Sequence, residues 1–117
     1  MRAIKFFRNS SNKCPVEEFL DSLSSRQARK VTWVMQLVEE VVRVPELYFK
    51  KLQNTNGIWE IRIQSGSSVF RILGFLDAND FIATNGFHKK SQKTPYNEIV
   101  LAEQRKYEYL DKRGGAL

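Results

Sequence analysis

The sequence is poor in cysteine, histidine and proline, and these shortages exclude several kinds of protein. Cys14 is the only cysteine among 117 residues, so no intrachain disulfide can form. One cysteine and one histidine, His88, cannot supply the ligands of a structural zinc site. We expect no metal and no cofactor. We interpret Cys14 as a small, partly buried residue rather than a nucleophile, because nothing near it in the sequence would activate a thiol.

Long apolar runs are also missing. No stretch approaches the roughly 18 apolar residues of a membrane-spanning helix, and the N-terminal segment MRAIKFFRNS lacks the apolar core of a secretory signal. A cytoplasmic location is therefore expected. The content of 42% hydrophobic and 27% charged residues is typical of a soluble globular protein. The length predicts one domain over residues 1–117 that can build its own core.

Acidic residues are outnumbered by basic ones. Lysine and arginine total 19 against 13 aspartates and glutamates, which gives a formal net charge of +6 and an isoelectric point near 9.6. Such an excess on a small domain favours a polyanionic partner such as nucleic acid. An acidic protein would satisfy the same charge.

Turn residues and apolar periodicity divide the chain into seven elements. The predicted strands are Ala3–Phe7, Ile58–Gln64, Val69–Leu76 and Phe81–Phe87. The first predicted helix runs from Pro15 to about Leu23, the second from a cap at Ser24 or Ser25 to about Val42, and the third begins at Thr94-Pro95. The second should bury one apolar stripe at helical spacing: Val31, Val34, Met35, Val38, Val41 and Val42. The segment ELYFKKLQNTNG is expected to be a loop. The order β-α-α-β-β-β-α predicts an α+β domain with a small, mostly antiparallel sheet and helices packed on one face.

The pairing of the three later strands decides which side chains meet, because strand residues alternate between faces. We take Gly66-Ser67 and Ala78-Asn79 as two-residue hairpin loops. The predicted opposed pairs are then Arg62 with Arg71, Arg71 with Gly86, and Val69 with His88. One face should carry Glu60, Arg62, Arg71, Thr84 and His88. The other should be an apolar wall of Trp59, Ile61, Ile63, Phe70, Ile72, Phe81, Ala83 and Phe87.

The arginine-bearing face allows two interpretations. It can be a surface network in which Glu60 separates two guanidiniums, or it can be a binding site for RNA. The second interpretation is favoured by the apolar residues that share this face and need a cover: Ile58, Val69, Leu73, Phe75 and Ile82. Gly86, expected opposite Arg71, would leave room there for a ligand.

The segment GFHKKSQKTP adds candidate chemistry at the end of the last strand. His88 is a candidate proton-transfer group, since an imidazole exchanges protons near neutral pH. Lys90 should share the face of His88, and Lys89 should point away from it. Lys93 lies beside the start of the last helix, a position suited to a phosphate. Simple solvation is the alternative for each lysine.

Several segments together are similar to one family. GIWEIRI, VFRILGF, NGFHKKSQKTP, NEIVLAEQRKYEYL and CPVEEFLDSL resemble the RelE/HigB superfamily of toxins, in particular its phage-derived HigB-like branch. The resemblance implies a compact RelE-like domain. It also implies the toxin of a type II toxin–antitoxin pair, which cuts mRNA on the ribosome without a metal. The implied partners are the ribosome, mRNA and a helix-turn-helix antitoxin, with DNA reached only through the antitoxin and no membrane.

The resemblance also implies roles for individual residues. Arg62 and Arg71 would clamp the phosphate, His88 would be the acid or base, and Lys90 or Lys89 would assist. The implied RNA-binding residues are Lys50, Lys51, Lys93 and Glu60. Some members carry a tyrosine near the end of the last strand, where this chain has Phe87-His88. A non-catalytic RNA- or ribosome-binding inhibitor and an inactive antitoxin-binding module remain alternatives.

Overall fold

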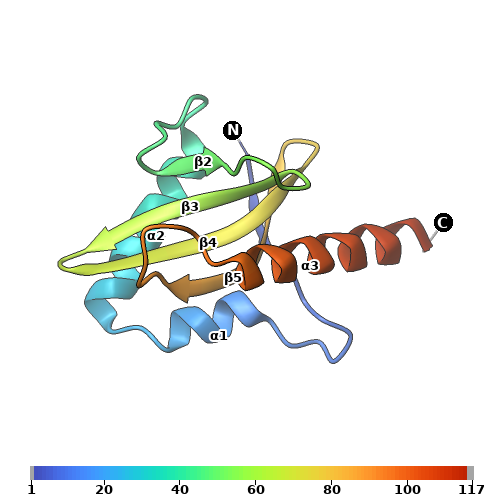
Figure 1. Cartoon of the computed structure of the whole chain (residues 1–117), viewed down its shortest axis with the longest axis horizontal. Coiled ribbons are helices and arrows are strands. Elements are labelled where there is room, and N and C mark those ends of the chain that lie inside the picture. Colours follow the sequence, from blue (N-terminus) through green and yellow to red (C-terminus); the bar gives the residue numbers. More distant parts are fainter. Residues whose placement is uncertain (1, 116–117) are drawn as a thin grey trace.

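The computed structural model describes residues 2–115, in which three helices surround one five-stranded sheet (Figure 1). The elements in chain order are β1 (Ile4–Phe6), α1 (Pro15–Asp21), α2 (Ser25–Glu40), β2 (Phe49–Lys51), β3 (Ile58–Ser65), β4 (Ser68–Asp77), β5 (Asp80–His88) and α3 (Tyr96–Gly115). The strand order is β1-β5-β4-β3-β2, with β1 parallel to β5 and the other neighbours antiparallel. The predicted α+β class is confirmed. None of the described helices is long and apolar enough to cross a membrane.

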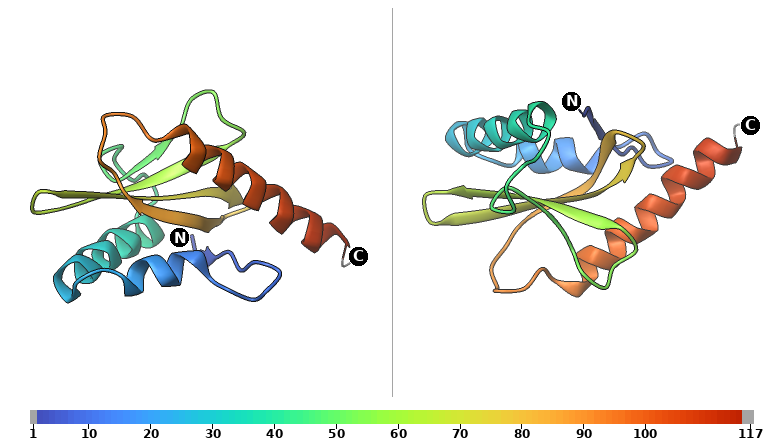
Figure 2. Two further views of the ribbon diagram at one scale, coloured as in Figure 1. Left: turned by 60° about the horizontal axis from the view of Figure 1, so that its bottom comes forward. Right: turned by 90° about the horizontal axis from the view of Figure 1, so that it is seen from above.

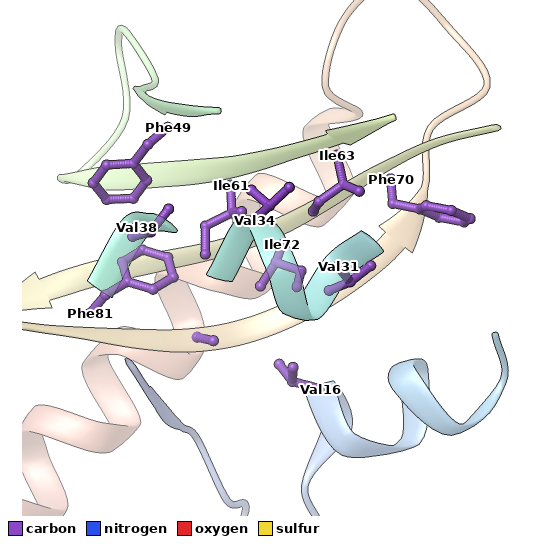
Figure 3. Close-up of a cluster of buried hydrophobic side chains, with 11 residues drawn as sticks. Val16, Val31, Val34, Val38, Phe49, Ile61, Ile63, Phe70, Ile72 and Phe81 are labelled. Atoms are coloured by element: carbon purple, nitrogen blue, oxygen red, sulfur yellow. The ribbon is translucent and has the colours of Figure 1, made fainter. Parts of the chain in front are cut away.

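Helices α1 and α2 cover one face of the sheet. Ser24 and Gln27 form a capping box that starts α2. Val31, Val34 and Val38 of α2 are fully buried against the sheet, as the apolar stripe predicted (Figure 3). Val42, which was placed on the same stripe, lies beyond the end of α2 at Glu40 and is 75% exposed, so its predicted burial is wrong. Each valine costs a helix about 0.5 kcal/mol relative to alanine, whereas burying its side chain contributes about 1.5 kcal/mol or more. Tertiary packing therefore holds this helix.

Helix α3 covers the opposite face, so the prediction that all helices pack on one face is wrong (Figure 2). Ala102 of α3 is fully buried, and Ile99 and Leu110 pack beside it. Their partners on the sheet are Ile58, Leu73, Phe75 and Ile82. Of the five residues that sequence reasoning left for a ligand to cover, Val69 lines a surface groove and the other four are these. A helix of this chain covers them instead.

Strand β2 lies inside the segment that was predicted to be a loop. Phe49 pairs with Ile61 and is buried, and its ring stacks on that of Trp59 with the centroids 4.8 Å apart. A strand of three residues is too short to show a periodic pattern. The pairing of β2 with β3 and the burial of Phe49 determine where this strand forms.

The predicted register is confirmed between β3 and β4, where Arg62 lies opposite Arg71. It also holds at the start of the next hairpin, where Gly74 lies opposite Ala83. A bulge then intervenes between Leu73 and Gly74, and Leu73 pairs with Asn85. Thr84 is therefore the extra residue in β5.

Contacts around the bulge explain why it forms. A Cβ atom on Gly74 would lie 2.2 Å from the backbone oxygen of Ile82, so only glycine allows this approach. The Thr84 hydroxyl donates to the Leu73 carbonyl oxygen at 3.1 Å, and Arg105 of α3 donates to the Thr84 carbonyl oxygen at 2.8 Å. Asn85 donates to a carboxylate oxygen of Glu98 at 2.9 Å. Helix α3 thus satisfies polar groups that the interrupted ladder exposes.

The bulge moves every later residue of β5 by one position. Arg71 lies opposite Phe87, not Gly86, and His88 lies opposite Phe70, not Val69. Phe87 therefore joins the core under α3, and His88 moves to the face of α1 and α2. Gly86 lies opposite Ile72, and a Cβ atom there would be 2.4 Å from the Phe19 ring. Its missing side chain makes room for α1, not for a ligand.

Candidate active site

The floor of the candidate site is a buried carboxylate between two guanidiniums. Glu60 and Arg62 are two residues apart on β3 and share the α3 face, and Arg71 joins them from β4. A carboxylate oxygen of Glu60 lies 3.5 Å from Arg71 Nε, and the other lies 3.6 Å from Arg62 Nε. Like charges opposite each other disfavour a sheet by up to about 1 kcal/mol, and Glu60 offsets this repulsion. The network that the sequence allowed is present.

This cluster keeps an excess of positive charge at a site that is withdrawn from water. Glu60 and Arg71 are only 3% and 7% exposed, whereas Arg62 is half-buried. Burial lowers the pKa of Arg71, the Glu60 carboxylate raises it, and Arg62 lowers it further. An arginine nevertheless stays protonated in proteins, so two cations face one anion. Arg71 Nε is buried without a hydrogen-bond partner among the described residues. An anion would compensate the remaining charge.

The segment after β5 is tied to the same carboxylate. Thr94 donates a hydrogen bond of 2.9 Å to the Glu60 carboxylate, which joins the segment before α3 to the sheet. On the other side, Arg62 donates to the backbone oxygen of Glu46 at 3.2 Å. Glu60 therefore organises two arginines and one loop at once.

Lys89 is the lysine that faces the arginines. Its backbone N–H donates to the Val69 oxygen at 2.7 Å, which continues the pairing of β5 with β4 by one residue. Burial is the main cause that lowers the pKa of Lys89, Arg71 lowers it further, and Glu60 opposes them. The predicted orientation, with Lys90 toward the arginines and Lys89 away, is wrong. The bulge at Thr84 shifts the alternation of β5 by one residue, so Lys89 takes the face that was predicted for Lys90.

His88 does not lie with the arginines, so its predicted place on their face is wrong. Its ring packs against the Phe70 ring on the α1 and α2 side, with the centroids 5.1 Å apart. His88 still borders the surface groove above the arginines, which we call the arginine groove. The groove is lined by Arg62, Ser67, Val69, Arg71, His88, Lys89, Lys90, Ser91 and Gln92.

The other predicted lysines divide between the two faces. Lys50 lies opposite Glu60 and thus shares the face of the arginines, whereas Lys51 lies opposite Trp59 on the other face. Lys90 and Lys93 are exposed in the segment that connects β5 to α3. Cys14 is buried at the start of α1, as its interpretation as a structural residue requires, and burial raises its pKa.

Sequence reasoning missed the position of Lys89 and the link from Thr94 to Glu60. A signal for the first was present, since a glycine inside a strand often marks a bulge. Gly74 stands within the apolar run of β4 and is such a glycine. Nothing in the sequence indicated the second, because Thr94 and Glu60 are 34 residues apart.

The fold and the groove define a RelE-like α+β domain with a basic site on one face of its sheet. The family model described as "Phage derived protein Gp49-like (DUF891)" matches residues 18–107. The chain therefore belongs to the Gp49-like family of phage-derived proteins, which stands in the context of RelE-like toxin–antitoxin proteins. A search of curated proteins found no match.

Proposed function

We propose that this chain is the toxin of a type II toxin–antitoxin system, of the HigB-like branch, and that it cuts mRNA on the ribosome. Its inhibiting partner would be a small helix-turn-helix antitoxin. One observation carries the proposal: Arg62 and Arg71 flank a single buried carboxylate, and Lys89 lines the same open groove as the two arginines. Membership in a family that is commonly toxin-like supports it.

The proposed reaction needs charge stabilisation and one proton donor. The ribose 2′-oxygen attacks the adjacent phosphorus and its proton passes to solvent. The bond from phosphorus to the 5′-oxygen breaks, which leaves a 2′,3′-cyclic phosphate. Arg62 and Arg71 bind the phosphate oxygens and stabilise the additional negative charge of the transition state. Lys89 donates a proton to the leaving 5′-oxygen. Ribosomal RNA would order the message in the groove.

Induction of the chain in bacteria should produce discrete cuts in translated messages. Primer extension on messages from induced cells would reveal the cuts, and addition of purified ribosomes to the purified protein should reproduce them. Cuts that occur equally without ribosomes would contradict ribosome dependence. Intact messages in cells whose translation has stopped would contradict cleavage and support a non-catalytic inhibitor.

Replacement of Lys89 by alanine should reduce ribosome-dependent cleavage by about a hundredfold, the usual contribution of a general acid. Because burial and Arg71 lower the pKa of Lys89 below its ordinary 10.5, the protonated form is lost at a lower pH than in a free lysine. The wild-type rate should therefore fall as the pH rises through that lowered value. The Lys89→Arg variant, which keeps the charge, should cleave slowly and lack this alkaline decline.

Two further variants make the Lys89 experiment specific. Lys13→Ala removes an equal charge from an exposed position that does not line the arginine groove, and it should cleave as the wild type does. His88→Ala should have a smaller effect than Lys89→Ala, because the His88 ring packs on the other face. A larger loss in His88→Ala would assign the proton transfer to the histidine and contradict the role of Lys89.

A further inference from the structure

A second groove adjoins the arginine groove and has a different composition. It shares Arg62, Val69 and Arg71 with the first, and the other lining residues are Lys30, Leu47, Tyr48, Ile63 and Gln64. We call it the Tyr48 groove. The two grooves meet at the guanidiniums, so a ligand bound to the arginines can extend into the Tyr48 groove without leaving the surface.

The short length of β2 opens this groove. β2 pairs with β3 only from Trp59 to Ile61, and the Arg62 N–H then donates to the Tyr48 oxygen at 2.8 Å. β3 continues to Ser65, so its outer edge runs past the end of β2. The Tyr48 groove lies along this edge, and it brings Lys30 of α2 to the same surface as Arg62.

Trp33 lies beside the groove, in contact with two of its lining residues, Tyr48 and Lys30. The rings of Trp33 and Tyr48 meet edge to face with their centroids 5.8 Å apart, and Lys30 Nζ lies 5.0 Å from the centroid of the Trp33 ring. Trp33 is 49% exposed and Leu47 is 69% exposed. A single exposed tryptophan is ordinary, but one joined to a tyrosine, an exposed leucine and a lysine beside two arginines makes an extended platform.

The basic and aromatic composition of the two grooves favours single-stranded nucleic acid as the partner. Proteins that bind single-stranded nucleic acid combine a positive groove for the backbone with aromatic rings on which bases stack. The residues that line the two grooves include arginines, lysines and a histidine, and none of them is an aspartate or glutamate. The Glu60 carboxylate lies below the surface, where both arginines already engage it. The charge of the surface thus complements a polyanion along its whole length.

We propose that the Tyr48 groove is a subsite for the RNA strand next to the scissile phosphate. A base in this subsite packs on Tyr48 and on the adjacent Trp33, and Lys30 neutralises the neighbouring phosphate. The inference rests on the proposed function, because it takes the arginine groove as the place of the cleaved bond. It adds that the protein itself holds the strand beyond that bond.

The test is binding of a short, fluorescent, single-stranded 2′-O-methyl RNA, which cannot be cleaved because its 2′-oxygen is blocked. Trp33→Ala should weaken binding about fivefold or more, as expected for loss of one stacked base. Lys30→Gln should weaken it and reduce the salt dependence of binding by about one phosphate contact. In ribosome-dependent cleavage, both variants should raise KM more than they lower kcat. Thermal unfolding of each variant shows whether it is folded.

Matched controls remove similar side chains elsewhere. Tyr107→Ala takes away an aromatic ring that is 61% exposed on α3, and Lys112→Gln takes away an exposed charge near the end of the same helix. Both should bind the RNA as the wild type does. If these controls lose as much affinity as Trp33→Ala and Lys30→Gln, the binding is nonspecific and the subsite is wrong.

The outcomes separate this inference from the proposed function. If Trp33→Ala and Lys30→Gln keep both affinity and KM while Arg71→Ala loses cleavage, the subsite is wrong and the nuclease stands. If the wild type cuts no message but the two variants lose RNA affinity, the nuclease is wrong and the RNA groove stands. If the wild type binds an acidic peptide in place of the RNA, and both variants lose that binding, the groove belongs to a protein partner and the inference is overturned.

Discussion

Replacing Arg71 by alanine is expected to reduce mRNA cleavage by at least about a hundredfold and to abolish growth inhibition on induction. Removing one preorganised donor from a site that stabilises developing charge typically has an effect of this size. Arg71 is the more buried of the two guanidiniums, and its buried Nε has no hydrogen-bond partner among the described residues. An electrostatic interaction is stronger where water is excluded. Single-turnover cleavage on programmed ribosomes measures the effect.

The same substitution also removes a partner from a buried carboxylate. Breaking a buried ion pair from one side can cost about 3 kcal/mol, so Arg71→Ala alone could lose activity by unfolding. The variant Arg71→Ala/Glu60→Gln removes both charges and should restore stability without restoring cleavage. The cleavage rate of Glu60→Gln alone is the reference for the double variant. Arg8→Ala is the control for loss of a guanidinium, because Arg8 is exposed and pairs with Glu17 on the surface. A folded double variant that cleaves as fast as Glu60→Gln would contradict the role of Arg71.

Replacing Gly74 by alanine is expected to lower the free energy of unfolding by about 3 kcal/mol. The new methyl group would lie 2.2 Å from the Ile82 oxygen and 2.5 Å from Cζ of Phe81, and the first of these atoms is backbone in the neighbouring strand. The central hairpin must therefore move to accept it. For a domain of this size the loss corresponds to a decrease in Tm of about 10 °C or more. Urea unfolding followed by tryptophan fluorescence measures it.

Gly66 provides the matched control for Gly74. It lies in the loop between β3 and β4 with a φ of +61°, and a Cβ atom there would contact nothing within 4 Å. Gly66→Ala should thus cost only the strain of a left-handed residue, about 1 kcal/mol. Equal losses in the two variants would show that steric contact at the bulge is not the cause. If Gly74→Ala folds by losing the bulge, Lys89 moves away from the arginines and cleavage falls with it.

Local chemistry made much of the fold predictable. The predicted cap at Ser24 or Ser25 located the start of α2, and the valine spacing located most of its buried side. The two-residue loop at Gly66 set the pairing of Arg62 with Arg71 correctly, since a tight hairpin leaves little freedom of register. These predictions depend on residues that are close in the chain or joined by a short turn.

The errors all came from interactions between distant elements. Strand β2 forms because Phe49 pairs with Ile61 of β3 and its side chain is buried in the core. The sequence of this short strand shows no periodic pattern that would predict it. The face chosen by α3 depends on which side of the sheet still has uncovered apolar residues once α1 and α2 are in place. The bulge at Gly74 depends on its contact with Ile82 and on hydrogen bonds from α3. A strand register predicted by counting residues outward from a turn assumes strict alternation and therefore cannot include a bulge.

The sequence by itself determined the class of the domain, most of its elements and the pairing that sets two arginines side by side, because local propensity and a tight turn suffice for these. Only the tertiary structure decided which further cation joins the arginines. One extra residue in β5 turns His88 away and brings Lys89 in, and that residue is held by atoms of α3 and of the neighbouring strand. The physical reason is the period of two in a strand, which converts a shift of one residue into a change of face.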